Sequence, residues 1–239
     1  MTKGAAIVTG GAGGIGRAVL ARLAADGFIP VSWDLSTDAP TAKLAIAVDV
    51  TDAAALQVAA SRTIAEAGPI RAVVINAGIL GPVARAWEVS PADLRRVIET
   101  NLVSAFLTAQ VTVPHLLANP PGPDRGRLVL ISSVQAKEGT ALSGPYAAAK
   151  AGMIALTKVL GKELAAEGVL VNAITPTVVR TAMEREISPA RRADLLARIP
   201  MNRFLDAEEV AEMVAFLCGP GCSFSTGAVF DLSGGRSTY

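Results

Sequence analysis

Between a short apolar run and an amphipathic segment, the chain carries the stretch Thr9-Gly10-Gly11-Ala12-Gly13-Gly14-Ile15-Gly16. The preceding run, Ala5–Thr9, is typical of a buried strand, and Ile15–Ala25 repeats apolar residues at helical spacing. Glycines at a strand-to-helix junction allow a sharp turn and a close approach of ligand to backbone. The helix N-terminus adds free N–H groups and a partial positive charge. The stretch therefore predicts a pyrophosphate-binding turn, although its Gly-x3-Gly-x-Gly spacing differs from the general dinucleotide fingerprint. The candidate contacts are Gly10, Gly14, Ile15 and Gly16.

The rest of the chain alternates short apolar runs with helical patterns, which is typical of a parallel sheet buried on both faces. Further strands are expected at Ile29–Trp33, Leu44–Val48, Ala72–Ile75, Arg127–Ser132, Val169–Ile174 and Ala228–Leu232. Further helices are expected at Ala53–Ala67, Tyr146–Ala166 and Ala207–Cys218, with one or two more within Pro91–Leu117. The pattern predicts an α/β fold, doubly wound around a seven-stranded parallel sheet, as a single domain over residues 1–239. The least regular stretch, 177–203, is a candidate substrate-covering segment.

Composition excludes several classes of protein. The 239 residues are 51% hydrophobic with a formal net charge of +1, so nothing indicates nucleic acid or an acidic membrane as partner. No apolar run is long enough to span a membrane, and the early glycines interrupt any signal-peptide core, so we expect a cytoplasmic protein. His115 and the pair Cys218 and Cys222 lack further metal-binding neighbours in sequence. We expect no metal site, which argues against a zinc-dependent dehydrogenase and against a Ser-His-Asp hydrolase.

A carboxylate follows the second expected strand. Asp34 comes 18 residues after Gly16, where it can accept hydrogen bonds from the hydroxyls of an adenosine ribose. The same charge would repel a 2′-phosphate, and the neighbours of Asp34 supply no cation. Arg17 is the nearest cation and weakens this argument somewhat. An ordinary loop carboxylate is the alternative for Asp34 taken alone. We expect NAD as cofactor rather than NADP.

Tyr146 and Lys150 lie four residues apart on an expected helix and therefore share one face. Ketone reduction needs a proton donor at the carbonyl oxygen, and alcohol oxidation needs a base there. A free phenol has a pKa of about 10 and is a poor base at neutral pH, but a nearby ammonium lowers that pKa. Ser133, at the end of an expected strand, can hydrogen-bond the substrate oxygen. A helix-surface Tyr–Lys pair is the alternative without chemistry.

Together these residues resemble the short-chain dehydrogenase/reductase family, over nearly the whole chain from Lys3 to about Gly235. The resemblance rests on Thr9-Gly10-x3-Gly14-Ile15-Gly16, Asn76-Ala77-Gly78, Asn101, Ser133 and Tyr146-x3-Lys150 in this order. It implies that Tyr146 is the general acid/base and that Lys150 lowers its pKa and holds the nicotinamide ribose. It also implies that Ser133 orients the substrate and that Asn101 anchors a water of the proton relay. Ser133 is chosen over Ser132 because it lies 13 residues before Tyr146.

The same resemblance implies further cofactor contacts. These are Asp49 and Val50 at the adenine, Asn76, Ala77 and Gly78 beside the cofactor, and Pro176, Val179 and Thr181 at the nicotinamide. The family often has Pro-Gly where this chain has Pro176-Thr177, so the local turn is expected to differ, because a β-branched residue rarely takes a positive φ. The stretch from Pro176 to Met183 is similar to the xylulose and carbonyl reductase branch. A homotetramer, or a homodimer, is also implied, paired through the long helices.

Substrate choice stays open at this stage. We expect a small-molecule substrate, a sugar, polyol or small cyclic secondary alcohol. The alternative enzyme is a 3-oxoacyl thioester (acyl carrier protein) reductase, and the alternative of another class is a non-catalytic dinucleotide-sensing protein. By resemblance, Gln135, Lys137, Glu138 and Ser143 lie near the pocket, where they either hydrogen-bond a polyhydroxylated substrate or form a solvated loop.

Overall fold

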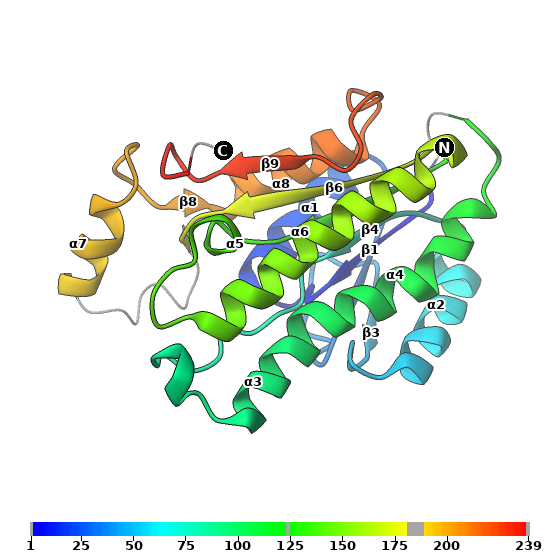
Figure 1. Cartoon of the computed structure of the whole chain (residues 1–239). Helices are drawn as coiled ribbons and strands as arrows, with labels where there is room; N and C mark the ends of the chain where they lie inside the picture. The colour runs from blue at the N-terminus through cyan, green and yellow to red at the C-terminus, as the bar shows by residue number, and fades with distance from the viewer. Residues whose placement is uncertain (1, 123–124, 181–188, 238–239) are drawn as a thin grey trace.

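The computed structural model describes residues 2–122, 125–180 and 189–237. Its centre is the expected seven-stranded sheet, in the order β3-β2-β1-β4-β5-β6-β9, with every pairing parallel (Figure 1). The strands are β1 Ala5–Thr9, β2 Ile29–Asp34, β3 Leu44–Ala47, β4 Ile70–Ile75, β5 Gly126–Ile131, β6 Val169–Pro176 and β9 Val229–Leu232. The order reverses direction beside β1, so the crevice for a ligand is expected at the carboxyl ends of the strands there.

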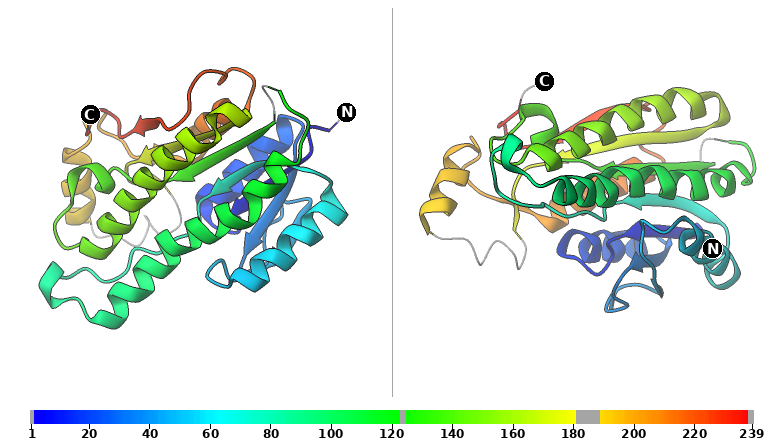
Figure 2. Two further views of the ribbon diagram at one scale, coloured as in Figure 1. Left: turned by 45° about the vertical axis from the view of Figure 1, so that its right-hand side comes forward. Right: turned by 60° about the horizontal axis from the view of Figure 1, so that its bottom comes forward.

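Helices cover both faces of the sheet (Figure 2). The helices that pack along the sheet and its flank are α1 Gly14–Ala25, α2 Ala53–Ala67, α3 Pro91–Ile98, α4 Ser104–Leu117, α6 Gly144–Leu164 and α8 Ala207–Cys218. Further helical elements are η1 Ala86–Glu88, η2 Glu99–Val103, α5 Gln135–Glu138, η3 Ala165–Glu167 and α7 Pro189–Ala197. Buried side chains of α1 and α8 form the core on one face, and those of α2, α4 and α6 form the core on the other. This two-sided burial confirms the doubly wound arrangement.

Local signals explain why two helices have the bounds that the sequence predicts. The Asp52 side chain accepts hydrogen bonds from the first backbone N–H groups of α2, and Gly68 ends that helix with a positive φ of 81°. Asp206 and Glu209 form a reciprocal capping box at the start of α8. Of the described helices, none is long and apolar enough to cross a membrane.

The stretch 177–203, the least regular in sequence, contains a strand and a helix in its described part. Here β7 Val179–Arg180 pairs in parallel with β8 Leu205–Asp206, and α7 begins at Pro189. The polar composition of α7 conceals the helix in sequence, while Ile199 and Phe204 beyond it are almost fully buried. Residues 181–188, which include Thr181, lie outside the described residues.

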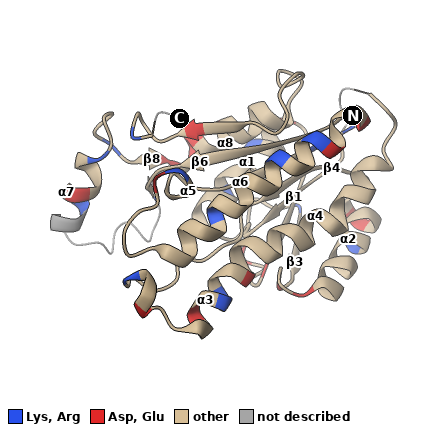
Figure 3. Cartoon of the chain, viewed as in Figure 1, with Lys and Arg blue, Asp and Glu red and all other residues tan. Residues whose placement is uncertain are grey.

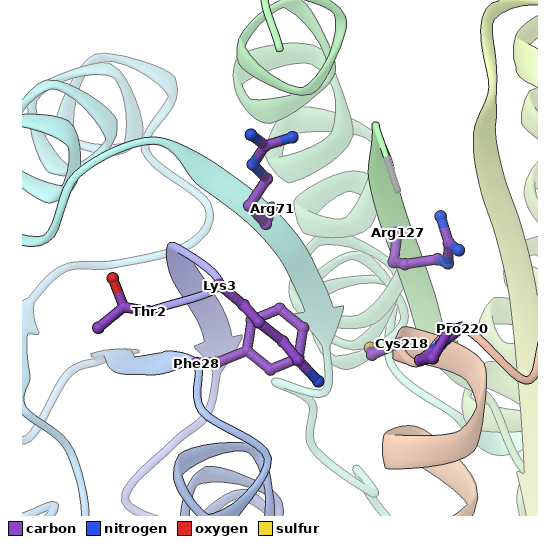
Figure 4. Close-up of a pocket in the computed structure, with 7 residues that line it drawn as sticks. All are labelled: Thr2, Lys3, Phe28, Arg71, Arg127, Cys218 and Pro220. Atoms are coloured by element: carbon purple, nitrogen blue, oxygen red, sulfur yellow. The ribbon is translucent and has the colours of Figure 1, made fainter. Parts of the chain in front are cut away.

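A hollow of about 340 Å³ opens at the amino ends of the strands (Figure 4). Its lining includes Lys3, Phe28, Arg127 and Cys218, and the Lys3 ammonium lies 5.1 Å from the centroid of the Phe28 ring. Lys3, Phe28 and Arg127 precede or begin β1, β2 and β5, and Cys218 ends α8, whereas the predicted site residues follow the strands. The hollow is therefore at the opposite edge of the sheet from the candidate active site.

Candidate active site

The glycine-rich turn between β1 and α1 is packed so closely at Gly10 and Gly16 that these positions leave little room for a side chain. Gly10 has a positive φ of 67°, and its carbonyl oxygen accepts a hydrogen bond from Gly13 N at 3.2 Å. A β-carbon on Gly16 would lie only 2.2 Å from that same carbonyl oxygen. The first turn of α1 therefore sits directly against the loop, where its free N–H groups suit a pyrophosphate.

Thr9 and Asn76 join the glycine turn to the end of β4. The Thr9 hydroxyl accepts hydrogen bonds from the backbone nitrogens of Asn76 at 2.9 Å and Ala77 at 3.1 Å. In return, Asn76 Nδ2 donates to the carbonyl oxygens of Thr9 and Gly10. The two predicted cofactor loops thus form one unit. Sequence reasoning missed this role of Thr9, since 67 residues separate the partners.

Asp34 lies at the end of β2 and faces the glycine turn. Its Oδ2 accepts a hydrogen bond from Ala12 N at 3.1 Å, and its Oδ1 accepts one from Ser36 N at 3.0 Å. Each oxygen keeps a further lone pair, so the carboxylate is oriented while it can still accept ribose hydroxyls. This geometry fits the expected role of Asp34 in binding an adenosine ribose.

Asp49 and Val50 follow β3 next to this region. Asp49 Oδ1 accepts hydrogen bonds from Thr51 N and Thr51 Oγ1, which lower the pKa of the Asp49 carboxyl. Val50 is buried. The Asp49 side chain therefore shapes the turn after β3, and its contact with adenine stays a prediction.

Two serines follow β5 and have different surroundings. Ser132 Oγ donates to the carbonyl oxygen of Lys150 at 2.8 Å, so it ties β5 to α6. Ser133 instead lies close enough to Tyr146 to oppose the rise that burial causes in the pKa of its hydroxyl, and its Oγ accepts a hydrogen bond from Gln135 N at 3.2 Å. Of the pair, Ser133 is therefore the one positioned beside the Tyr146 hydroxyl.

Lys150 lies beneath Tyr146 in the interior. Its side chain is buried, with Nζ 5.8 Å from the centroid of the Tyr146 ring and donating to the carbonyl oxygen of Ile131 at 2.8 Å. Burial lowers the pKa of Lys150 to about 8. Burial also raises the pKa of Tyr146, and the neighbouring Ser133 side chain opposes that rise. The lowering of the Tyr146 pKa by Lys150 stays a prediction.

Asn101 lies in η2, a π-helical turn that joins α3 to α4. Its fully buried side chain donates to the carbonyl oxygens of Val97 and Ile79, both at 2.9 Å, and its Oδ1 accepts from Ile79 N at 3.2 Å. A β-carbon on Gly78 would lie 2.3 Å from Asn101 Oδ1 and 3.5 Å from Lys150 Nζ. The structure thus brings the Gly78 turn, Asn101 and Lys150 together, while the water that Asn101 is expected to anchor stays a prediction. A π turn is a frequent feature of functional sites.

The nicotinamide-side residues follow β6. The Pro176 carbonyl accepts a hydrogen bond from Val134 N at 3.0 Å, and Thr177 N donates to Leu232 O at 3.1 Å. Apart from glycines, only Leu142 and Asn202 among the described residues have positive φ. Thr177 therefore keeps an ordinary backbone, as its β-branched side chain requires. Val179 lies in β7, and Thr181 is outside the described residues.

The charged groups of Lys137 and Glu138 both form ion pairs within the protein. Lys137 Nζ lies 3.0 Å from Asp231 Oδ1, and the Arg236 guanidinium lies 2.6 Å from Glu138 Oε2. These ion pairs hold the C-terminal segment against α5, across more than 90 positions of sequence. Ser143 precedes α6 and accepts a backbone hydrogen bond from Ala147 N. Gln135 differs, since its Oε1 is buried without a hydrogen-bond partner among the described residues.

A family model described as enoyl-(acyl carrier protein) reductase matches residues 10–237. A 2-dehydro-3-deoxy-L-rhamnonate dehydrogenase (NAD(+)) of Sphingomonas sp. is 40% identical, over 98% of this chain and 95% of the relative. The chain belongs to the short-chain dehydrogenase/reductase family.

A cis-4-hydroxycyclohexanecarboxylate dehydrogenase of Sinomonas cyclohexanicum is 36% identical, over 96% of this chain and 95% of the relative. The Brucella melitensis 3-ketoacyl-(acyl-carrier-protein) reductase, solved with NADH, superposes with a TM-score of 0.92 at 27% identity, covering 99% of each chain. This short-chain dehydrogenase/reductase is therefore an oxidoreductase that acts on CH–OH groups.

Proposed function

We propose that this enzyme interconverts a secondary alcohol and a ketone with NAD(H), and that its substrate is a sugar acid, a polyol or a small cyclic alcohol. The observation that carries the proposal is the position of Tyr146, whose ring centroid lies 5.8 Å from the buried Lys150 ammonium and whose pKa, raised by burial, is lowered in part by the neighbouring Ser133 side chain. When bound, the nicotinamide accepts or supplies the hydride. All other steps fall to side chains of the protein.

The side chains supply the proton chemistry. In oxidation, the Tyr146 oxygen takes the proton of the substrate hydroxyl, and in reduction it returns that proton to the carbonyl oxygen. Ser133 donates a hydrogen bond to the same substrate oxygen and steadies the charge that develops there. The Lys150 ammonium favours the phenolate form of Tyr146 while it remains protonated. Asn101 completes the relay by holding a water near Lys150.

The preference for NAD is supported by Asp34. Its oriented carboxylate accepts hydrogen bonds from ribose hydroxyls and repels a 2′-phosphate. The Sphingomonas relative is named for NAD(+), and the Brucella enzyme was solved with NADH. The tight turn at Gly10 and Gly16 supplies the phosphate end of the same site.

The substrate class is supported by Gln135 and by the two relatives. Both of those relatives are named for an acid that carries a hydroxyl or keto group. Gln135 follows Ser133 by two residues, and its buried Oε1 lacks a partner among the described residues. A buried acceptor without a donor costs about 1–3 kcal/mol, so a second substrate hydroxyl that donates to it would be bound favourably. We therefore propose that Gln135 selects hydroxylated substrates.

The first experiment follows NADH formation with purified full-length protein and NAD. The panel comprises sugar acids, polyols, cyclic alcohols and 3-hydroxyacyl thioesters, with Tyr146→Phe as the matched inactive variant. Turnover of a hydroxy acid or cyclic alcohol by the wild type, lost in Tyr146→Phe with NAD binding retained, supports the proposal. Turnover of the thioesters alone overturns the proposed substrate class. Turnover only with NADP overturns the role given to Asp34.

Two alternatives lead to different results in the same panel. The likeness to the Brucella reductase favours 3-oxoacyl thioester reduction as the second candidate function. A dinucleotide sensor would bind NAD, show no turnover, and keep its binding and signalling in Tyr146→Phe. The juxtaposition of Asn101, Ser133, Tyr146 and Lys150 argues against a sensor, which has no need of a proton relay.

We also propose a homotetramer, or a homodimer, that works in the cytoplasm. Phe106 on α4 and Val159 on α6 are about half exposed, which supports pairing through these helices. The free thiols of Cys218 and Cys222 suit a reducing compartment. Light scattering of the wild type and of Phe106→Glu tests the assembly: a monomeric wild type would overturn it.

The segment 177–203 is proposed to cover the bound substrate. Its described parts, β7 and α7, follow the carboxyl end of β6 and lie at the same end of the sheet as α5 (Figure 1). Slower proteolysis within this segment when NAD and substrate are present is the expected result. Equal cleavage with and without ligands would contradict the proposal.

A further inference from the structure

The adenosine end of the site carries a charged pair that the catalytic chemistry does not use. Arg17 stands immediately after the glycine turn, and its Nε donates to the carbonyl oxygen of Ala12 at 2.7 Å. Its NH2 donates twice to Asp38, to the carbonyl oxygen at 2.8 Å and to Oδ2 at 2.7 Å. The guanidinium is therefore held between the glycine turn and the loop after β2.

Arg17 lies close enough to Asp34 to affect binding at the ribose. Ala12 N donates to Asp34 Oδ2 at 3.1 Å, while Ala12 O accepts from Arg17 Nε at 2.7 Å. Because the nitrogen and oxygen of one residue are at most about 4 Å apart, Arg17 Nε lies within roughly 10 Å of that carboxylate oxygen. An arginine at such a distance reaches a phosphate on the ribose by a change of rotamer, and its guanidinium suits phosphate in a bidentate contact.

The loop from Asp34 to Asp38 is organised to keep Arg17 where it is. Ser36 N donates to Asp34 Oδ1 at 3.0 Å, and Asp38 N donates to Ser36 Oγ at 3.1 Å. Asp38 thus has a defined position relative to Asp34, and both carboxylates belong to one turn. Figure 3 marks the basic residues of the chain in blue and the acidic residues in red.

We propose that Asp38 is a second determinant of dinucleotide choice, which acts by holding the Arg17 guanidinium away from the 2′ position of the adenosine ribose. This inference rests on the proposed NAD dependence. Asp34 repels a 2′-phosphate directly, whereas Asp38 withholds the cation that would otherwise attract one. Asp38 is a positioning residue and touches no reacting atom.

The size of the effect follows from exposure. The side chains of Arg17 and Asp38 are 40% and 76% exposed, and exposed pairs of this kind contribute little. We therefore expect Asp38→Asn to tighten NADP binding by about 2- to 5-fold, with the Kd for NAD changed less than about 2-fold.

The test is a double-mutant cycle in an Asp34→Asn background, which removes the charge that repels a 2′-phosphate and keeps a side-chain oxygen that can accept a hydrogen bond from Ser36 N. Calorimetry gives the Kd of NAD and NADP for Asp38→Asn, Arg17→Gln and the combination, with unfolding midpoints recorded to confirm folding. Glu66→Gln, which breaks the similarly exposed Arg62–Glu66 pair on α2, is the matched charge control. We expect tighter NADP binding from Asp38→Asn with Arg17 present and none with Arg17→Gln.

Two outcomes overturn the inference. One is an unchanged NADP affinity in Asp38→Asn, and the other is the same gain whether or not Arg17 is present, which would mean that Asp38 only repels the phosphate. If Glu66→Gln increased the affinity for NADP by the same factor, the effect of Asp38→Asn would be explained by the change in net charge alone. Loss of NAD binding by the wild type would instead contradict the proposed function itself.

Discussion

Replacing Lys150 with methionine should change the pH dependence of stability in a way that measures the cost of the buried ammonium. Burial lowers the pKa of Lys150 from its ordinary 10.5 to about 8. Below pH 8 the folded and unfolded states both hold the proton, so the folded state bears a penalty of about 3 kcal/mol. As pH rises from 8 toward 10.5, the folded state releases the proton first, and the wild type becomes more stable.

The methionine variant has no such titration. Relative to wild type, its free energy of unfolding should therefore fall by about 2–3 kcal/mol between pH 7 and pH 10. At pH 7 the relief of the charge penalty is offset by loss of the hydrogen bond to the Ile131 carbonyl, worth about 1.5–3 kcal/mol. The variant should thus be about as stable as wild type at pH 7, although it loses turnover.

Urea unfolding at the two pH values gives the required free energies. Lys158→Met is the matched control, since Lys158 is an exposed lysine on the same helix α6. The difference in free energy of unfolding between Lys158→Met and wild type should not change with pH. The reasoning is refuted if the free energies of unfolding of Lys150→Met and Lys158→Met both change between pH 7 and pH 10 as much as that of wild type does. In that case the Lys150 ammonium bears no burial penalty.

Three further substitutions test separate parts of the structure. Gly16→Ala should abolish measurable NAD binding, because its β-carbon would lie 2.2 Å from the Gly10 carbonyl oxygen; an unchanged Kd by calorimetry would contradict the packing of that turn. Asn101→Ala should lower the free energy of unfolding by about 1–3 kcal/mol, since it removes the buried partner of Ile79 N and of two carbonyl groups; a chemical unfolding curve identical to wild type would argue against this. Asp52→Ala should lower the same free energy by about 1 kcal/mol through loss of the α2 N-cap, with kcat unchanged, and a drop in kcat would show that α2 affects the site.

Much of the fold is predictable from the sequence because its signals are local. The apolar run Ala5–Thr9 and the helices Ala53–Ala67 and Ala207–Cys218 have the predicted bounds, since strand burial and helix caps are encoded within a few residues. Other elements escaped prediction for the opposite reason, and two of them show why. The helix Pro189–Ala197 is polar, and η2 interrupts a continuous helical pattern at Asn101, whose amide bonds to the Val97 and Ile79 carbonyls.

For the site, the sequence by itself determined the chemical types and their spacing: a glycine turn after a strand, a carboxylate at Asp34, and Tyr146 one helical turn before Lys150. Only the tertiary structure decided what surrounds each group. It placed Lys150 in the interior, where burial lowers its pKa, and it joined Thr9 to Asn76 and Arg17 to Asp38. Desolvation and contacts between distant segments depend on how the layers pack, and no local pattern of residues records them.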